Sequence, residues 1–229
     1  MNQGSLYFGK FQRKEIIEHW EQEYPNSIKD INISGIRVIG SKDNVRFQIP
    51  ERGVDINGNV IWESYNMHKN DFVHRYTTRE MAEFSVSFAT NWAKYQIDNY
   101  QSQTPVKFND FSMAGNGHSP LNHHEGTYPF DLMIPSKNGQ DIRFFDNRPD
   151  GILSKPTYDK MGNVNLNPNY DREKTIQMIK VIGESLPPGK IAEIRFNDPE
   201  VIKYFKGTNI KVIYSGGHDH HIDVRLKEE

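Results

Sequence analysis

Apolar and polar positions along the chain follow two different periods, and the longest regular pattern has the period of a helix. Between residues 79 and 100 apolar side chains recur every three or four positions, which is typical of an amphipathic helix. They are Met81, Phe84, Phe88, Trp92 and Tyr95. Thr77 or Thr78 is the expected N-cap. We expect this helix to be the longest in the protein and to form the main part of its core.

Three other segments have helical spacing. Residues 12–24 place four apolar side chains among charges, and Pro25 closes the run. Asp171 is the expected N-cap of a second amphipathic helix that ends before the PPG at 187–189. A short helix is expected after Asp198, because Pro199 is suited to the first helical position.

Shorter alternating runs predict strands. In the first half they are INISGIRVIG, NVRFQIP and GNVIWESY, joined by tight turns, and in the second half TYPFDLMIP, QDIRFFD, IAEIRFN, NIKVIYS and HIDVRL. The fold class predicted is α+β, with a mainly antiparallel sheet flanked by helices and an elaborated N-terminal half. We expect residues 1–105 to form a helix, strand and helix extension packed on a core of residues 106–229.

Composition restricts the chemistry. The 229 residues carry a formal net charge of -2 without a cluster of Lys and Arg, so neither nucleic acid nor an anionic membrane is an expected partner. Because the chain has no cysteine, a metal can be held only by His, Asp or Glu. No apolar run approaches the roughly 20 residues that cross a bilayer, and the polar start lacks the apolar stretch of a signal peptide. We expect a soluble protein, without membrane insertion, whose action outside the cytoplasm would require a signal removed from this chain or a different export route.

Histidines are concentrated in two places. Of nine, six lie in two clusters, His118, His123 and His124 in a glycine-rich loop and His218, His220 and His221 near the C-terminus. His124 precedes Asp131 by seven residues, a spacing at which the loop can fold the imidazole back over the strand that bears the carboxylate. His221 and Asp223 are two apart in an extended segment and project from one face. Three of these four side chains would hold zinc, and the fourth would be free to move a proton.

A simpler interpretation treats HDHH as an exposed loop or the remnant of a purification tag, and Asp131 as a turn cap. The apolar strand pattern that follows directly, in HDHHIDVRL, favours the metal site.

These residues resemble a known family. The pair His124 and Asp131, followed by GHDHHIDVRL and IRFNDPEVIKYF, resembles the zinc peptidases grouped with lysostaphin, D-Ala-D-Ala peptidases and the hedgehog signalling domain. Within that group the pattern looks most like penicillin-insensitive murein endopeptidases. The resemblance covers residues 110–229, which would then be a metallopeptidase-like catalytic core.

The resemblance implies a role for each matching residue. His124 and Asp131 would be zinc ligands, His221 the base beside the metal, and His218 a further catalytic histidine. The family's third ligand is a histidine, and here Asp223 takes that position. Two alternatives stay open: His221 becomes the third ligand and leaves His218 or His220 as base, or His123 replaces His124, because Gly126 lies at the family's spacing from His123.

The expected reaction is zinc-assisted hydrolysis of an amide bond, as in a murein endopeptidase or carboxypeptidase. The resemblance implies a peptidoglycan peptide as substrate, with D-Ala and diaminopimelate in its cross-links. His123, Tyr128, Phe130 and the 146–170 loop are candidates to line its cleft. Arg225 lies on the same strand face as Asp223 and would bind a substrate carboxylate or form a structural salt bridge.

Two other functions fit parts of the sequence. The adjacent histidines of NHHEG are typical of metal nucleases of the His-Asn-His kind, although the next histidine lies about a hundred residues away and the surface is not basic. The other function is a cell-wall binding module without turnover, and Asp223 is the feature that favours it.

A wall-degrading enzyme without a signal peptide also suggests a secreted antibacterial effector, active in the periplasm or outside the cell and paired with an immunity protein.

Overall fold

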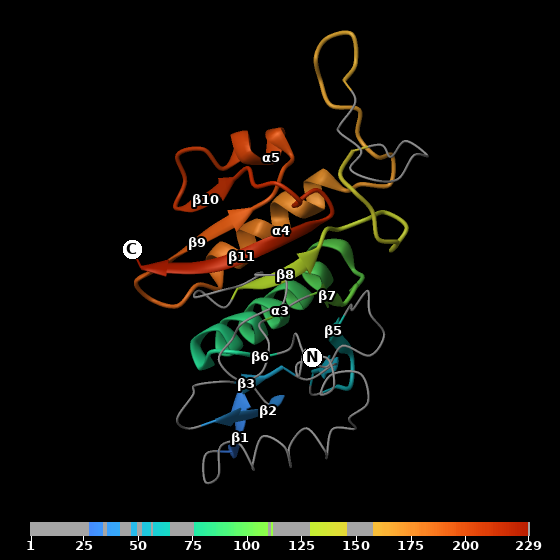
Figure 1. Ribbon diagram of the computed structural model, residues 1–229. Helices are drawn as coiled ribbons and strands as arrows, with labels where there is room; N and C mark the ends of the chain where they lie inside the picture. The colour runs from blue at the N-terminus through green and yellow to red at the C-terminus, as the bar shows by residue number, and fades with distance from the viewer. Residues whose placement is uncertain are drawn as a thin grey trace, which may run out of the picture. The chain divides into compact units, whose positions relative to one another are not determined.

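The computed structural model describes residues 28–33, 36–41, 47–49, 52–55, 57–64, 76–109, 111, 129–145 and 158–228. The chain divides into two compact units, Met1–Phe130 and Asp131–Glu229, whereas the sequence placed the boundary after residue 105. Strands and helices combine in the described residues, which confirms the α+β class (Figure 1). The helix expected at 12–24 lies outside the described residues.

The first unit contains a small antiparallel sheet with the order β1-β2-β3-β6. Its strands are β1 (Ile28–Ile33), β2 (Ile36–Ser41), β3 (Phe47–Gln48) and β6 (Tyr76–Thr77). β1 and β2 are consecutive in the chain, and all six residues of each strand are paired with the other. β1 and β2 confirm the strands predicted for INISGIRVIG.

The first unit also contains three further strands, two of which contact the long helix. β4 (Arg52–Val54) pairs antiparallel with β5 (Val60–Ser64), and β5 pairs parallel with β7 (Val106–Phe108). The helix α3 (Arg79–Tyr100) begins at Thr78, whose Oγ1 accepts a hydrogen bond of 3.2 Å from the Met81 amide. The predicted helix and one of its two predicted caps are therefore confirmed.

The core of the first unit is aromatic. The ring of Phe130 lies 5.5 to 6.3 Å from four other phenylalanine rings, and all five side chains are buried. The four are Phe84, Phe88, Phe108 and Phe111. Since residues 106–111 pack with α3, they belong to the first unit and the boundary lies later than predicted.

The second unit contains four strands in the order β10-β9-β11-β8. They are β8 (Phe130–Met133), β9 (Lys190–Arg195), β10 (Ile210–Ile213) and β11 (His221–Glu228), with β9 parallel to β10 and antiparallel to β11. All four were predicted, and two parallel pairs, β9–β10 and β5–β7, accompany the mainly antiparallel pairing that the sequence predicted.

Both predicted helices of this unit are confirmed with their caps. α4 (Arg172–Glu184) begins after Asp171, whose side chain accepts from the Lys174 amide, and α5 (Pro199–Tyr204) begins after Asp198. α4 packs along β9, as Figure 1 shows. Asp198 also receives two hydrogen bonds, of 2.7 and 3.0 Å, from the guanidinium of Arg172, which joins the first turns of the two helices.

Alternation along β9 and β11 gives their two faces different chemistry. Ala192, Ile194, Ile222 and Val224 are fully buried and form the apolar face. The intervening positions are polar, and the pairing register sets Arg195 opposite Asp223 and Glu193 opposite Arg225. Because successive side chains point to opposite sides, these four charged side chains share the other face.

One predicted strand is wrong. Residues 140–145, the described part of QDIRFFD, form no strand, and Phe145 makes only an isolated bridge to Leu166. The Phe144 amide donates to the Asp219 carbonyl, and the Phe144 carbonyl accepts from Asn167. Ile142, Phe144 and Phe145 are buried. The alternating pattern therefore reflects burial of a connecting segment between two loops.

No helix in the described part of the chain is both long and apolar enough to span a membrane.

Candidate functional site

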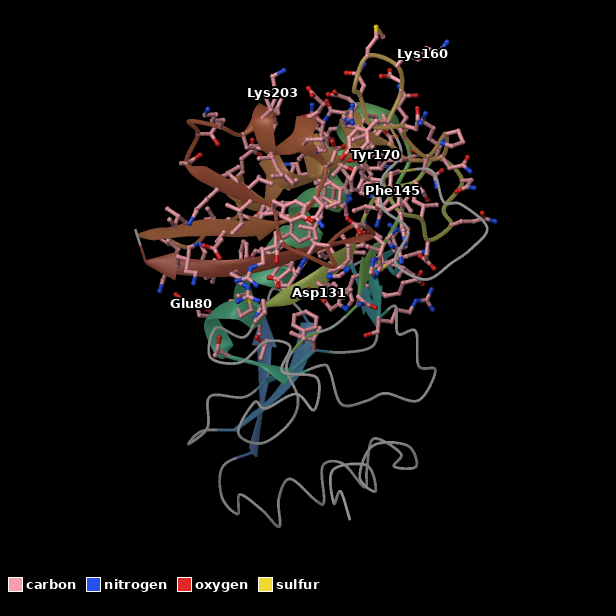
Figure 2. The ribbon with its side chains drawn as sticks, turned by 45° about the horizontal axis from the view of Figure 1, so that its top comes forward. Glu80, Asp131, Phe145, Lys160, Tyr170 and Lys203 are labelled. Atoms are coloured by element: carbon pink, nitrogen blue, oxygen red, sulfur yellow. The ribbon has the colours of Figure 1, made fainter. Side chains whose placement is uncertain are left out.

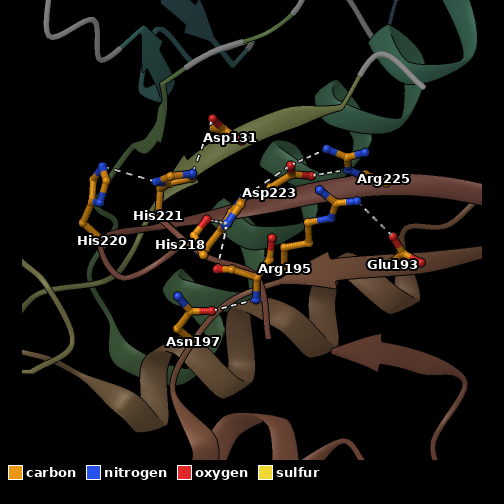
Figure 3. Close-up of polar contacts among 11 residues, drawn as sticks. Asp131, Glu193, Arg195, Asn197, His218, His220, His221, Asp223 and Arg225 are labelled. Carbon is orange, nitrogen blue, oxygen red and sulfur yellow. Dashed lines mark hydrogen bonds and ion pairs between the residues drawn. The ribbon is translucent and has the colours of Figure 1, made fainter. Parts of the chain in front are cut away.

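The predicted site residues of the second unit meet where β8 and β11 lie side by side. His221 is the first residue of β11, and its Nε2 lies 3.7 Å from Oδ2 of Asp131 on β8 (Figure 3). Asp131 is 3 % exposed and the His221 side chain 14 %. An imidazole and a carboxylate that are far apart in sequence are therefore close together in a largely buried position.

The other ring nitrogen of His221 contacts a second histidine. His221 Nδ1 lies 3.2 Å from His220 Nε2, so one of the two nitrogens donates and the other accepts. Burial lowers the pKa of His220, and the positive charge of Arg143 lowers it further. A neutral His220 can accept from His221 Nδ1, and this arrangement leaves the Nε2 lone pair of His221 facing Asp131.

His218 is held by the turn that precedes β11. Its Nδ1 lies 3.1 Å from the carbonyl oxygens of both Ser215 and Gly216, and because carbonyls only accept, Nδ1 carries the proton. Gly217 has a φ of 88°, in the left-handed region that favours glycine. The His218 Nε2 is left 3.5 Å from Asp223 Oδ2, close enough for an ion pair when the ring is doubly protonated.

Asp223 is bound mainly by Arg225. The guanidinium donates two hydrogen bonds, of 2.9 Å to Oδ1 and 2.8 Å to Oδ2. Burial alone would lower the pKa of Arg225, but these bonds and the charge of Asp223 outweigh it and raise the pKa. Of the two roles predicted for Arg225, this geometry fits the structural salt bridge, and a bidentate pair of this kind fixes the Asp223 carboxylate strongly.

Asn197 fixes the segment that bears His218. Its side-chain oxygen accepts from the Ser215 amide at 2.8 Å (Figure 3). Its side-chain amide donates to Asp219 Oδ1 at 2.9 Å, and its backbone amide donates to the His218 carbonyl at 3.1 Å. Asp219 also pairs with Arg143 at 3.8 Å. Asn197 is 6 % exposed, so three hydrogen bonds from one buried residue define the turn.

Some of the predicted site residues belong to the described part of the chain and others do not. His123, His124 and Tyr128 lie outside the described residues. Phe130 is fully buried in the core of the first unit, so its predicted place in the wall of a cleft is wrong. Sequence reasoning missed Asn197, Asp219 and Arg195. The asparagine stands between a strand and a helix cap, in FND, and this position was the one available signal.

The described donors fit part of a zinc site. Two ligands about 2.0–2.2 Å from a tetrahedral zinc ion lie roughly 3.3–3.6 Å from each other. Asp131 Oδ2 and His221 Nε2, at 3.7 Å, are near that separation. Asp223 fits less well, because Arg225 occupies both of its oxygens. Among the described residues, which do not include His124, there is no group of three or more His, Asp or Glu arranged to hold a metal ion.

This result favours one of the two ligand sets that the sequence left open. In that set His221 would be the third ligand beside Asp131, and Asp223, whose Oδ2 lies 3.5 Å from His218 Nε2, would not bind the metal.

No protein-family model matches the chain, and no curated protein matches it in sequence.

Proposed function

We propose that the protein is a zinc-dependent peptidase that hydrolyses an amide bond in the peptide stems or cross-links of peptidoglycan. The observation that carries this proposal is the pairing of Asp131 with His221, 3.7 Å apart, directly beside a second carboxylate and imidazole pair, Asp223 with His218. One pair supplies metal ligands and the other supplies a group that moves a proton. The substrate class comes from the family resemblance of residues 110–229.

Zinc would be held by Asp131, His221 and a histidine of the loop before β8, for which His124 is the residue predicted from the sequence. When bound, zinc would polarise the scissile carbonyl and increase the acidity of water. The hydrogen bond between His221 Nδ1 and His220 would fix the orientation of the ligand ring, as outer hydrogen bonds do in many metal sites.

His218 is the residue best placed to transfer a proton. Its Nδ1 proton is held by two backbone carbonyls, so Nε2 is the atom that gains and loses a proton. Asp223 Oδ2, at 3.5 Å, would stabilise the imidazolium formed when His218 accepts a proton from the attacking water. His218 would then return this proton to the departing amine.

Digestion of purified sacculi tests the proposal. We expect the zinc-loaded protein to release soluble muropeptides, whose masses identify the bond cleaved. A chelator should stop the release and added zinc should restore it, and His221→Ala should be inactive. Lys203→Gln is the matched control, because Lys203 projects from α5 with 76 % of its side chain exposed (Figure 2). Absence of muropeptide release by the zinc-loaded protein would contradict the proposal.

The proposed substrate also suggests a place of action, the periplasm or the outside of the cell. We propose a secreted antibacterial effector, whose producer would need an immunity protein against it. The support for this step is the proposed substrate class.

A second candidate is a cell-wall binding module without turnover. The bidentate bond between Arg225 and Asp223 favours it, because the family's third metal ligand is replaced here by a residue engaged in a salt bridge. The sacculus experiment separates the two: a binding module would cosediment with sacculi and release nothing.

A further inference from the structure

The polar face of the second unit's sheet carries Arg195, a cationic residue that has no role in the proposed reaction. Arg195 is the last residue of β9, and the register pairs it with Asp223 on β11. Directly paired side chains on one face of an antiparallel sheet have Cβ atoms about 4.5–5.5 Å apart. Arg195 is therefore one cross-strand step from the carboxylate that contacts His218.

The cations on this face differ in how closely each is paired with a carboxylate, and Arg195 is the least closely paired. Asp223 is bound by Arg225 through both oxygens. Glu193 accepts a hydrogen bond of 3.2 Å from Lys211 through Oε2. The guanidinium of Arg195 lies 3.8 Å from the other oxygen of Glu193, a separation that exceeds hydrogen-bond distance. With Asp131, whose charge also acts on Arg225, three carboxylates and three cations share this face, and Arg195 has the longest of the three cation–carboxylate contacts.

One hydrogen-bond donor of Arg195 also has no partner among the described residues. Its Nε is buried and has no hydrogen-bond partner in the described part of the chain. A buried donor without a partner is costly, so such a group is expected to meet a ligand or water. The side chain is nevertheless 30 % exposed, and a small ligand can reach it.

We propose that Arg195 binds the carboxylate of the substrate, an inference that rests on the proposed peptidase function. A guanidinium offers two parallel N–H donors that match the two oxygens of a carboxylate. Figure 3 shows the Arg195 side chain extending along the sheet from the end of β9 that lies beside His218. This role was one of the two predicted for Arg225, whose bonds to Asp223 fit the other, a structural salt bridge.

The position of Arg195 restricts the substrate. The carboxylate would lie close to the amide that His218 serves, because Arg195 is paired across the strands with Asp223, and Asp223 Oδ2 lies 3.5 Å from His218 Nε2. The substrate class is therefore a peptide with a free carboxylate close to the scissile bond. Two sources share this chemistry, the C-terminal carboxylate of the peptide and the side-chain carboxylate of an acidic or branched residue.

Binding of three small probes to the ¹⁵N-labelled full chain tests the inference. N-acetyl-D-alanine carries a terminal carboxylate, N-acetyl-D-alaninamide carries none, and the α-amide of N-acetylglutamate carries only a side-chain carboxylate. We expect saturable shifts at β9 and β11 with at least one acid, and affinity for it about tenfold higher than for the neutral amide, as charge-assisted hydrogen bonds allow. The acid that binds identifies the source of the carboxylate.

Variants assign the preference to Arg195. In Arg195→Gln the affinities for acid and amide should become equal to within about twofold, and Arg195→Lys, which keeps the charge but loses the paired donors, should be intermediate. Lys203→Gln removes an equal charge from exposed α5 and should keep the full preference. Equal affinities in the wild-type chain, no saturable binding up to about 50 mM, or an unchanged preference in Arg195→Gln would overturn the inference.

The two proposals can fail separately. Preference for acids that depends on Arg195, without release of muropeptides from sacculi, would retain the carboxylate site and contradict the peptidase. Release of muropeptides without such a preference would contradict the carboxylate site alone.

Discussion

At the scale of single residues, the role of each carboxylate in the site depends on the side chain that it contacts. The sequence placed Asp223 and Arg225 on one strand face, a spacing equally compatible with metal binding, substrate binding and a salt bridge. Only coordinates show that Arg225 donates to both oxygens of Asp223. Asp131, in contrast, faces His221 across two strands, as the sequence predicted.

Asn197 should be important for both stability and the position of His218. Asn197→Ala removes the side-chain hydrogen bonds to Ser215 and Asp219 and is expected to lower the free energy of unfolding by about 1–3 kcal/mol. Urea unfolding measures this loss, and the ring resonances of His218 should shift in the folded variant. Asn99→Ala is the control, since the side chain of exposed Asn99 donates to the Tyr95 carbonyl within α3, and its loss should cost less than about 0.5 kcal/mol. Equal losses in both variants would contradict a special role for Asn197.

At the scale of elements, helices were easier to predict than strands. The caps Thr78, Asp171 and Asp198 are local signals, readable because each side chain bonds an amide two or three residues later. A strand also needs a partner, which lies elsewhere in the sequence. Residues 140–145 have a strand-like pattern but bond to two loops, so their alternation predicted burial correctly and pairing wrongly.

Gly183 in α4 tests how closely the helix approaches the sheet. Alanine normally stabilises a helix relative to glycine by about 0.5–1 kcal/mol. Here a Cβ would overlap Cδ1 of Ile210 and lie 2.9 Å from its Cγ1. We expect Gly183→Ala to destabilise the protein by about 1–3 kcal/mol in urea unfolding. Adding Ile210→Val, which removes Cδ1, should recover part of the loss, and strictly additive effects would contradict this packing.

Tyr170, just before α4, should make the protein sensitive to alkali. Burial, and then the negative charge of Asp198, raise its pKa well above 10. Above about pH 10 the unfolded chain loses this proton while the folded chain keeps it, so the free energy of unfolding falls as pH rises. Tyr170→Phe should lose less stability than wild type between pH 7 and about pH 10.5 in urea unfolding. Parallel losses in the two proteins would contradict the prediction.

At the scale of the whole molecule, the sequence predicted the α+β class and most strands of the second unit, because these follow from local periodicity. It also predicted that Asp131 and His221 converge. It could not predict Arg195 or Asn197, because their importance arises from the β9–β11 register and from the turn between β10 and β11. The aromatic contacts of Phe130 likewise moved the boundary between the units, since packing partners are not visible in a local pattern.

The place of action can be tested in cells. Exported to the periplasm of a bacterial host, the protein is expected to cause lysis, because its substrate lies there, whereas the same chain kept in the cytoplasm should not. The control is His221→Ala exported at an equal level, which shows whether export of the protein by itself harms the cells. Optical density and microscopy after induction measure the outcome. Lysis by the His221→Ala variant would contradict hydrolysis as the cause.

The central claim is that Asp131 and His221, with a histidine of the preceding loop, hold one divalent ion, and that Asp223 serves His218 instead. Zinc affinity measured by competition with a chromogenic chelator tests it most directly. The account predicts one zinc per chain, affinity reduced by at least about tenfold in Asp131→Asn, His221→Ala and His124→Ala, and near-normal affinity in Asp223→Asn. Wild-type affinity in Asp131→Asn or His221→Ala, or loss of zinc in Asp223→Asn alone, would contradict the account.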